Sequence, residues 1–263
     1  MKICIGSDIV YNNTICKKNK INTNNLAELP SVLLNIKKIL NNLNIKVIQP
    51  KNVKVNTCMA LWMRDSFINI DDKLYLLPNS YSKKRIPEEE LKTINIEGEI
   101  VSHIYIDGGD IIQHNNTIFI GIGTRTKLEA YEWLKKEFPN KNIIKINHSA
   151  LHLDCCFCIL PNNTIIYSKK YIKSFPSLLR KKYTVTCVEE FINKNTNPNL
   201  ATNLLIINNT ILAADLTKFH RFYNYLESQG FHVILIPYYN IWKHGGGIRC
   251  LTQWIEKDNL SIS

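Results

Sequence analysis

The sequence predicts an α/β fold, a five-bladed α/β propeller of ββαβ repeats arranged around a central site. The first observation is a repeated turn, because the letters "NNTI" recur between pairs of apolar, alternating runs that are typical of β-hairpins. They stand at 115–118, 162–165 and 208–211. The second observation is the spacing of these turns, which is 44, 47 and 46 residues from Asp72 through Asn116 and Asn163 to Asn209. A regular period of this size indicates a repeat architecture.

The third observation is that each hairpin is followed by a helical pattern and then by another apolar run. The hairpins are predicted at 3–18 (a degenerate copy), 65–79, 107–123, 155–170 and 203–216. The unit is therefore strand–strand–helix–strand, and five such units in a closed ring make the propeller. Asn and Asp at the turns are expected because their short side chains tolerate the left-handed backbone that a tight hairpin needs.

Two helices stand out by their amphipathic spacing. The clearest is predicted over 125–138, "RTKLEAYEWLKKEF", with one apolar face. That face consists of Leu128, Tyr131, Leu134 and Phe138. A second is predicted over 216–230, with Gly230 as its C-cap. The apolar runs "NIIKI" and "FHVILIP" then supply the strand that closes each unit.

The composition is that of a globular protein, and we expect a single domain over residues 1–263. With 45% hydrophobic residues and no uninterrupted apolar run of membrane-spanning length, no membrane contact is expected. The start of the chain lacks the apolar core of a signal peptide, so a cytoplasmic protein, monomeric or homodimeric, is expected. The net charge of +11 comes from scattered lysines in an Asn-, Ile- and Lys-rich chain. We interpret it as codon bias rather than as a nucleic-acid footprint.

The stretch "HLDCCFC" at 152–158 raises the question of a metal site. On a straight strand, His152, Asp154, Cys156 and Cys158 would share one face at about 6.5–7 Å spacing. Zinc ligands lie about 2.0–2.3 Å from the ion, so we expect no metal and no other cofactor here. The predicted role of Cys155, Cys156 and Cys158 is core packing. The eight cysteines do not suggest a disulfide scaffold, and most of them are expected to be free, buried thiols.

Polar side chains stand where strands of the predicted hairpins begin, one set in each of four units. They are Arg64 and Asp65 in "WMRDSF", Asp107 and Asp110 in "IDGGDII", His152 and Asp154 in "HLDCCF", and Arg249 and Cys250 in "HGGGIRCLTQ". Because the units are related by pseudo-symmetry, the four sets are expected to meet in one axial cavity.

The motifs MRD, DGGD, HLDxxF and GGGxxC, in this order, resemble those of the guanidino-group-modifying superfamily. Its members include arginine, agmatine and peptidylarginine deiminases, dimethylarginine dimethylaminohydrolases and amidinotransferases. The resemblance extends from about residue 60 to residue 255. It implies the pentein fold, a five-bladed ββαβ propeller, which agrees with the repeat read from the turns.

The resemblance also implies a cysteine-based mechanism on an arginine-like guanidino substrate. Cys250 is implied to be the nucleophile, with His152 as general acid and base and Asp107 orienting that histidine. Asp65 and Asp154 are implied to grip the substrate, because a guanidinium group is a flat, permanent cation that binds between carboxylates.

Three further residues are assigned to substrate binding or to its support. The resemblance implies that Arg125 holds an α-carboxylate, which favours an amino-acid substrate over agmatine. Asp110 is predicted to contact the substrate or to support the residues that do. Arg64 is expected to pair with the acids around the site.

The expected activity is hydrolysis of free arginine or a close derivative to a citrulline-type ureido product. The family signals conflict, because arginine and agmatine deiminases usually have Glu at the position of Asp107, whereas dimethylargininases and amidinotransferases often have Asp. An amidinotransferase that uses the same residues is the first alternative. A non-catalytic, ribosome-binding propeller is the alternative from another class; it would explain the positive charge but would not need Cys250, His152 and both clamp acids.

Overall fold

The computed structural model describes most of the chain. The described residues are 1–6, 28–50, 61–80, 83–84, 91, 94–238 and 246–256. The turn of the degenerate first hairpin, at 12–14, and Gly245 of the glycine motif lie outside the described residues.

Five three-stranded sheets form the body of the described protein. They are β3 (Phe67–Ile70), β4 (Lys73–Leu76) and β7 (Glu99–Ile100); β8 (Ile111–His114), β9 (Thr117–Ile122) and β10 (Asn142–Asn147); β11 (Phe157–Ile159), β12 (Thr164–Tyr167) and β13 (Thr184–Cys187); β14 (Leu205–Ile207), β15 (Thr210–Asp215) and β16 (His232–Pro237); and β17 (Thr252–Glu256), β1 (Lys2–Ile5) and β2 (Lys46–Ile48). In every sheet the first pair is antiparallel and the second pair is parallel. A two-stranded sheet joins β5 (Asn79–Ser80) to β6 (Lys83–Lys84).

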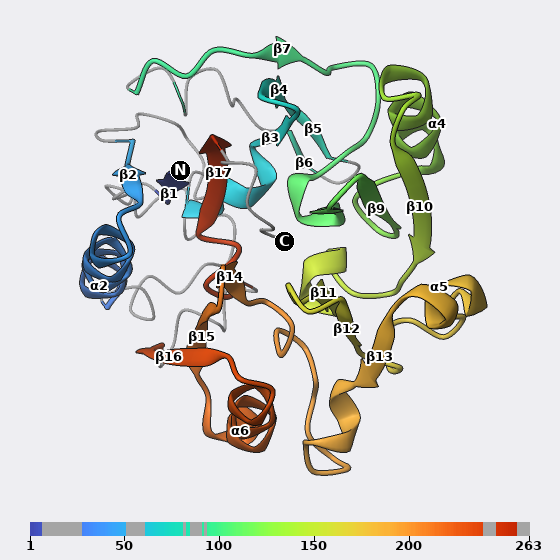
Figure 1. The fold of residues 1–263 in the computed structure, drawn as a ribbon. Coiled ribbons are helices and arrows are strands. Elements are labelled where there is room, and N and C mark those ends of the chain that lie inside the picture. Colours follow the sequence, from blue (N-terminus) through green and yellow to red (C-terminus); the bar gives the residue numbers. More distant parts are fainter. Residues whose placement is uncertain are drawn as a thin grey trace.

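The α-helices lie outside these sheets, and the sheets surround a common centre (Figure 1). The α-helices are α2 (Leu29–Asn42), α4 (Leu128–Glu137), α5 (Ser177–Lys182) and α6 (His220–Ser228). Short 3₁₀ helices are η3 (Met63–Asp65), η4 (Gly108–Asp110), η5 (Leu153–Cys155), η6 (Val188–Glu190) and η7 (Thr217–Phe219). The helices α4, α5 and α6 each connect the second strand of a sheet to the third, as the repeat predicts. No helix among the described residues is long and apolar enough to span a membrane.

The hairpin turns have the backbone conformation that their residues predict. Positive φ angles of 51–61° occur at Asp71, Asp72, Asn115, Asn163 and Asn208. These residue types pay the smallest steric cost in the left-handed region after glycine. Four of the five expected hairpins, and the period between them, are therefore confirmed.

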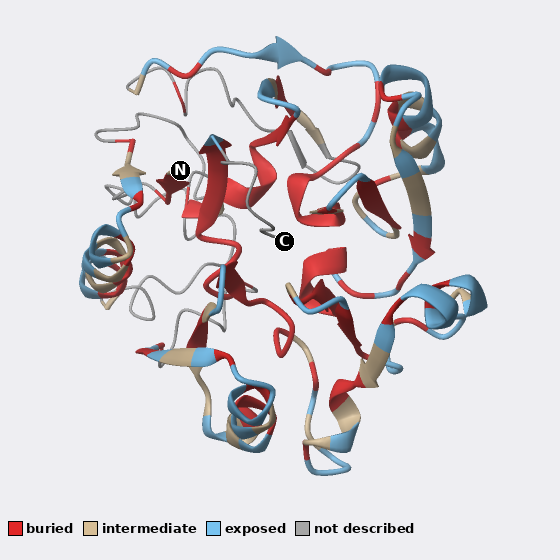
Figure 2. Ribbon diagram, in the orientation of Figure 1, coloured by how far each residue is buried: buried red, intermediate tan, exposed pale blue. Residues whose placement is uncertain are grey.

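The fifth sheet is built from both ends of the chain. Strand β17 pairs with β1, with Ile3 opposite Trp254 and Cys4 opposite Gln253, and β1 pairs in turn with β2. The hydrophobic core consists of five clusters of buried apolar side chains, and each cluster joins two neighbouring sheets. The cluster around Phe67 joins the fifth sheet back to the first. Figure 2 shows the buried residues gathered towards the centre and the exposed ones on the outer helices.

The two expected helices are shorter than predicted. Helix α4 begins at Leu128, which is 48% exposed, so the predicted apolar face is wrong at that position. The buried row is instead Ala130, Leu134 and Phe138, spaced by four residues, which is the spacing that lies along one helix face. The second helix divides into η7 and α6, and Gly230 follows α6 with φ of +87°, as a C-cap glycine should.

Candidate active site

The predicted polar residues lie in tight turns that precede the innermost strand of each sheet. The 3₁₀ helices η3, η4 and η5 lead directly into β3, β8 and β11. The chain turns at the same place before β14 and before β17, where Cys250 stands two residues ahead of Thr252. The labelled strands β3, β11, β14 and β17 surround the centre in Figure 1, so their leading turns face one another.

His152 lies between two of the predicted carboxylates. Its Nε2–H donates to Asp107 Oδ2 at 2.9 Å, and its Nδ1 lies 3.7 Å from Asp65 Oδ1. The main-chain N–H of Asp107 donates in turn to the hydroxyl of buried Thr126 at 3.0 Å. Side chains from three different repeats therefore meet here, and the imidazole is oriented by a buried carboxylate as a catalytic histidine is.

The charge state of His152 follows from this enclosure. Burial alone would lower the pKa of the imidazole, but the negative charges of Asp65, Asp107 and Asp110 outweigh burial. The pKa of His152 is therefore held well above its usual value of about 6.5. A protonated imidazole at neutral pH can give its proton to a leaving amine.

Asp154 is buried beside Arg249. Its Oδ2 lies 3.8 Å from Nε of Arg249. Burial raises the pKa of Asp154, and the charges of His152, Arg249 and Arg64 act against that rise. A further cation nearby would stabilise the charged form of this carboxylate, and a guanidinium substrate would supply such a cation.

Cys250 is held by a residue that the motifs did not reveal. The side-chain amide of Asn203 donates to Cys250 Sγ at 3.1 Å, and the Cys250 main-chain N–H donates to Asn203 Oδ1 at 3.3 Å. Asn203 precedes β14, the inner strand of the fourth sheet, by two residues, as Cys250 precedes β17 and Asp65 precedes β3. This shared position before the inner strand is the signal by which Asn203 could have been found.

Cys155 lies beside the nucleophile candidate, and the prediction that it extends outward on a strand is wrong. Residues 153–155 form a 3₁₀ turn, and β11 begins only at Phe157. The Cys155 thiol donates to Asp154 Oδ1 at 3.5 Å. Interaction with the Cys250 thiol, burial and the Asp154 charge together raise the pKa of Cys155 well above its usual value. Cys155, Cys156 and Cys158 are all buried members of the apolar core clusters, so the prediction of core packing is confirmed for each.

Asp110 connects its own turn, η4, to the turn that carries His152 and Asp154. Its Oδ1 accepts the Leu153 main-chain N–H at 2.7 Å and lies 3.0 Å from His148 Nε2. Both contacts fix the turn that carries His152 and Asp154. His148 had no motif to mark it, and its side chain is fully buried against Asp110.

Arg64 and Arg125 contact different parts of the site. Arg64 Nη1 donates to Gln253 Oε1 at 2.7 Å, and the Arg64 main-chain N–H donates to the carbonyl of Cys250 at 3.2 Å. Arg125 lies before α4 rather than in its first turn, and Nη1 of Arg125 is 3.9 Å from Asp107 Oδ2. The side chain of Arg125 is 11% exposed, more than any other predicted site residue whose side chain forms an ion pair here.

Glycine residues allow the turns that carry the site residues to approach one another closely. A Cβ atom on Gly109 would lie 2.8 Å from the His152 ring and 2.9 Å from Asp65 Oδ1. A Cβ atom on Gly247 would lie 2.5 Å from Asn203 Oδ1. Gly109 of the DGGD motif and Gly247 of the GGGxxC motif are therefore required by contact with site residues, as the prediction of tight turns at the site implies.

Two groups of side chains are close enough to share one cation. The donor atoms of His152, Asp154 and Cys155 lie within 4.8 Å of one another, and so do those of Asp65, Asp107 and His152. The argument from a straight strand against such a grouping does not hold, because η5 folds the donors together. Carboxylates in this arrangement can also receive the N–H groups of a guanidinium ion.

Comparisons with known proteins identify the family to which this chain is related. The family model described as arginine deiminase matches residues 58–202, which include the first three motifs. An uncharacterized protein of Bacillus subtilis strain 168, YkgA, is 31% identical over 151 residues, covering 56% of this chain and 51% of YkgA. AgrE of Nostoc sp. strain PCC 7120, a bifunctional arginine dihydrolase/ornithine cyclodeaminase, is 26% identical over 140 residues, covering 51% of this chain and 19% of AgrE. The matched region thus spans about half or less of these relatives.

Solved structures share the fold across the whole chain. The amidinotransferase SxtG from Microseira wollei, of the saxitoxin biosynthetic pathway, superimposes with a TM-score of 0.75 at 16% identity, covering 100% of this chain and 96% of SxtG. The N-terminal domain of the cyanobacterial arginine dihydrolase ArgZ, bound to product, also gives 0.75, at 18% identity and 97% coverage of both chains. These likenesses show a mixed α/β fold whose five small sheets are consistent with a pseudo-fivefold repeat. Because the family model covers just over half of the 263 residues, this chain belongs to the arginine deiminase family.

Proposed function

We propose that this protein hydrolyses the guanidinium group of free arginine or a close derivative, with its five sheets as the blades of an α/β propeller. The observation that carries the proposal is the meeting of Asp107, His152 and Asp65 in one buried site, with Cys250 held by Asn203 nearby. Members of this superfamily act on guanidino C–N bonds. The curated relative AgrE is an arginine dihydrolase, and this supports arginine as the substrate.

The proposed binding step places the substrate cation among buried acids. Asp65 and Asp154 receive the guanidinium N–H groups, which relieves the cost of keeping these carboxylates charged in a buried place. Arg125, the more accessible cation, receives the α-carboxylate. The positive group of the substrate also favours the thiolate form of Cys250, which is the form that attacks.

The proposed reaction then takes two steps. Cys250 Sγ forms a bond to the guanidinium carbon, and the carbon–nitrogen bond to the leaving group breaks as His152 gives that nitrogen a proton. Ammonia departs and leaves a thiouronium group on Cys250. His152, now neutral, takes a proton from water, and the hydroxide adds to the same carbon. The C–S bond breaks and the proton of the added hydroxyl group leaves to solvent, which releases a neutral ureido product and regenerates the thiolate.

The test is product analysis with arginine, methylated arginines, agmatine and peptidyl-arginine. We expect a ureido product from arginine and one ammonia, or one methylamine from a methylated arginine. The Cys250→Ala variant should make no product and should still bind arginine by calorimetry. Turnover that survives in Cys250→Ala would overturn the mechanism.

Two outcomes would change the reaction while keeping the site. A second hydrolysis, as in the dihydrolase relatives, would yield ornithine, carbon dioxide and a second ammonia. Amidine transfer is the second candidate, because the structure of SxtG, an amidinotransferase, matches this chain over nearly its full length. It would yield no ureido product but a new guanidino compound when glycine or another amine is added. RNA or ribosome binding that is salt-sensitive and unchanged in Cys250→Ala, without turnover, would favour the non-catalytic alternative.

A further inference from the structure

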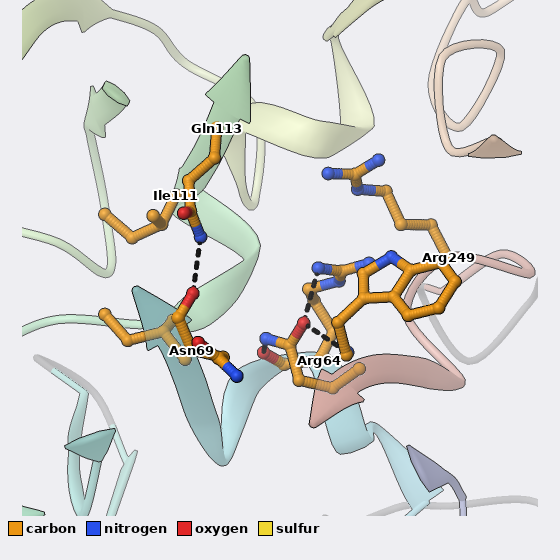
Figure 3. Close-up of a pocket in the computed structure, with 8 residues that line it drawn as sticks. Arg64, Asn69, Ile111, Gln113 and Arg249 are labelled. Carbon is orange, nitrogen blue, oxygen red and sulfur yellow. Dashed lines mark hydrogen bonds between the residues drawn. The ribbon is translucent and has the colours of Figure 1, made fainter. Parts of the chain in front are cut away.

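A small polar pocket lies among the innermost strands of three sheets, next to the turns of the candidate active site. It is lined by Arg64, Ile68, Asn69, Ile111, Gln113, Arg249, Gln253 and Trp254. None of these eight side chains is acidic, and two are guanidinium groups. Figure 3 shows the guanidinium groups of Arg64 and Arg249 on one side of the pocket and Asn69, Ile111 and Gln113 on the other.

Arg64 is a buried cation, and only part of its guanidinium group has hydrogen-bond partners among the described residues. The residue is 4% exposed, and its Nη1 donates to Gln253 Oε1 at 2.7 Å. Its Nε and Nη2 atoms are buried and have no hydrogen-bond partner among the described residues. A buried guanidinium with two open donors is costly unless an acceptor meets them, and acceptors of negative charge meet them best.

Arg249 adds a second positive charge to the same space. Its Nη1 lies 3.5 Å from the Leu204 carbonyl, and its Nε faces Asp154 at 3.8 Å. Burial and the positive charge of Arg249 lower the pKa of Arg64 to about 9, despite the opposing charges of Asp154 and Asp65. The two guanidinium groups therefore repel each other in a buried place, and the neighbouring acids do not offset the combined effect of burial and this repulsion on Arg64.

The size of the pocket limits what can bind there. It leaves about 10 Å³ for the centre of a water-sized species. Roughly 10–15 Å³ by this measure is what a single water molecule requires. Among anions, only a monatomic ion comes near this size, and it requires a small outward shift of the lining side chains, whereas a phosphate or a carboxylate-bearing metabolite is several times too large.

We propose that Arg64 and Arg249 bind one monatomic anion of the chloride class in this pocket. The anion accepts hydrogen bonds from Nε and Nη2 of Arg64 and offsets the charge of Arg249. Because the main chain of Arg64 also donates to the Cys250 carbonyl, an occupied pocket stabilises the turn that precedes β17. No substrate carboxylate lines the pocket, although Arg249 also faces Asp154, and the proposal stands whether or not the proposed hydrolysis is correct.

The test compares thermal unfolding in sodium chloride and in sodium gluconate at equal ionic strength, because gluconate is too large for the pocket. We expect chloride to raise the Tm by roughly 4 °C at saturation, since a ligand that binds only the folded state stabilises it by mass action. Bromide should act in the same way. In crystals grown with bromide, an anomalous peak is expected within hydrogen-bond distance of both guanidinium groups.

Two variants at Gln113 provide a matched pair. Gln113→Glu and Gln113→Met both remove the amide that donates to the Asn69 carbonyl, but only Glu brings a negative charge to the pocket. The chloride-dependent rise in Tm should persist in Gln113→Met and be lost in Gln113→Glu. Equal Tm values in chloride and gluconate, or an unchanged chloride effect in Gln113→Glu, overturn the proposal. A bromide peak without stabilisation in solution marks an adventitious ion only and overturns it as well.

Discussion

Burial of four carboxylates in one site dominates the energetics at the scale of single residues. They are Asp65, Asp107, Asp110 and Asp154, all at least 96% buried. Removing a charged carboxylate from water is unfavourable unless cations and hydrogen bonds replace the lost hydration. For Asp65, Asp107 and Asp154 this compensation comes from the imidazole of His152 and from the guanidinium groups of Arg125 and Arg249. For Asp110 it comes from His148 and the Leu153 main-chain N–H. The charge of His152 should therefore matter to folding as well as to catalysis.

Stability is predicted to fall as the pH rises above neutrality, and His152 is the cause. Its pKa is raised in the folded protein, so the folded state binds the proton more tightly than the unfolded state does. The stabilisation is fully present below the unfolded pKa of about 6.5 and is lost as the pH rises through the folded value. Urea unfolding measured from pH 6 to pH 9 should show this decline.

A His152→Gln variant supplies the comparison, because glutamine keeps a donor for Asp107 but does not titrate. The difference in unfolding free energy between wild type and variant should shrink with rising pH. A difference that is constant over the whole range would show that the imidazole is not preferentially protonated in the fold.

Asn203 is predicted to position the nucleophile. Replacing it with leucine, which is similar in size, removes both contacts to Cys250. We expect kcat to fall about 10- to 100-fold with little change in KM, because misplacement of a reacting atom weakens the transition state more than substrate binding. The rate of Cys250 alkylation by iodoacetamide, measured against pH, should also change its midpoint.

The adjacent Thr202→Val variant is the control for Asn203. The Thr202 hydroxyl donates to the main-chain carbonyl of Asp154 and not to the thiol. A loss of folding stability is expected there, with an alkylation midpoint close to that of wild type. If both variants moved the midpoint equally, Asn203 would be a packing residue rather than a positioning one.

At the scale of elements, the site depends on turns that hydrophobic periodicity does not reveal. The stretch 152–158 alternates as a strand does, and the alternation predicts a strand throughout. Residues 153–155 form a 3₁₀ turn instead, and a three-residue turn is too short to leave a period of its own. The hairpin turns were predictable because each one requires a residue with positive φ, and Asn or Asp occupies that position.

Gly109→Ala is predicted to inactivate the protein through one of these turns. The added Cβ would lie against the His152 ring and Asp65 Oδ1, so both must move. A displacement of this kind lowers kcat/KM by about 100-fold or more. Activity and unfolding free energy of the purified variant should be measured together.

Gly230→Ala is the matched control, since Gly230 lies after α6 with open space around its Cβ position. Its φ of +87° makes alanine cost about 1–2 kcal/mol without touching the site. We expect this variant to be less stable and fully active. A Gly109→Ala enzyme with wild-type kcat/KM would contradict the close approach of the turns.

At the scale of the whole molecule, the repeat was visible in the sequence but its closure was not. The period of the turns and the four motifs predicted which residues meet, because sheets related by a repeat present equivalent positions to one centre. The fifth sheet could not be read in this way, because its strands β1 and β17 are 247 residues apart, from Ile5 to Thr252, and no hairpin turn connects them. Asn203 was missed for a related reason, since a lone asparagine before an apolar strand resembles any turn residue.

Closure by the two chain ends predicts that the site and the fold unfold together. Ile3 of β1 is fully buried opposite Trp254 of β17, the strand that follows Cys250. An Ile3→Ala substitution should cost about 2–5 kcal/mol, because it removes buried methyl groups and leaves a cavity. Far-UV circular dichroism and residual activity, followed in urea for this variant and for wild type, should give coincident midpoints.

The reason for coincidence is that each core cluster joins two neighbouring sheets, so no sheet can leave the ring without exposing apolar surface on both sides. The Ile3→Ala midpoint should therefore move to lower urea for both probes by the same amount. Activity lost at clearly lower urea than the circular dichroism signal would mean that the fifth sheet opens alone. In that case the pairing of β1 with β17 would act as a separate unit rather than as the closure of a single cooperative structure.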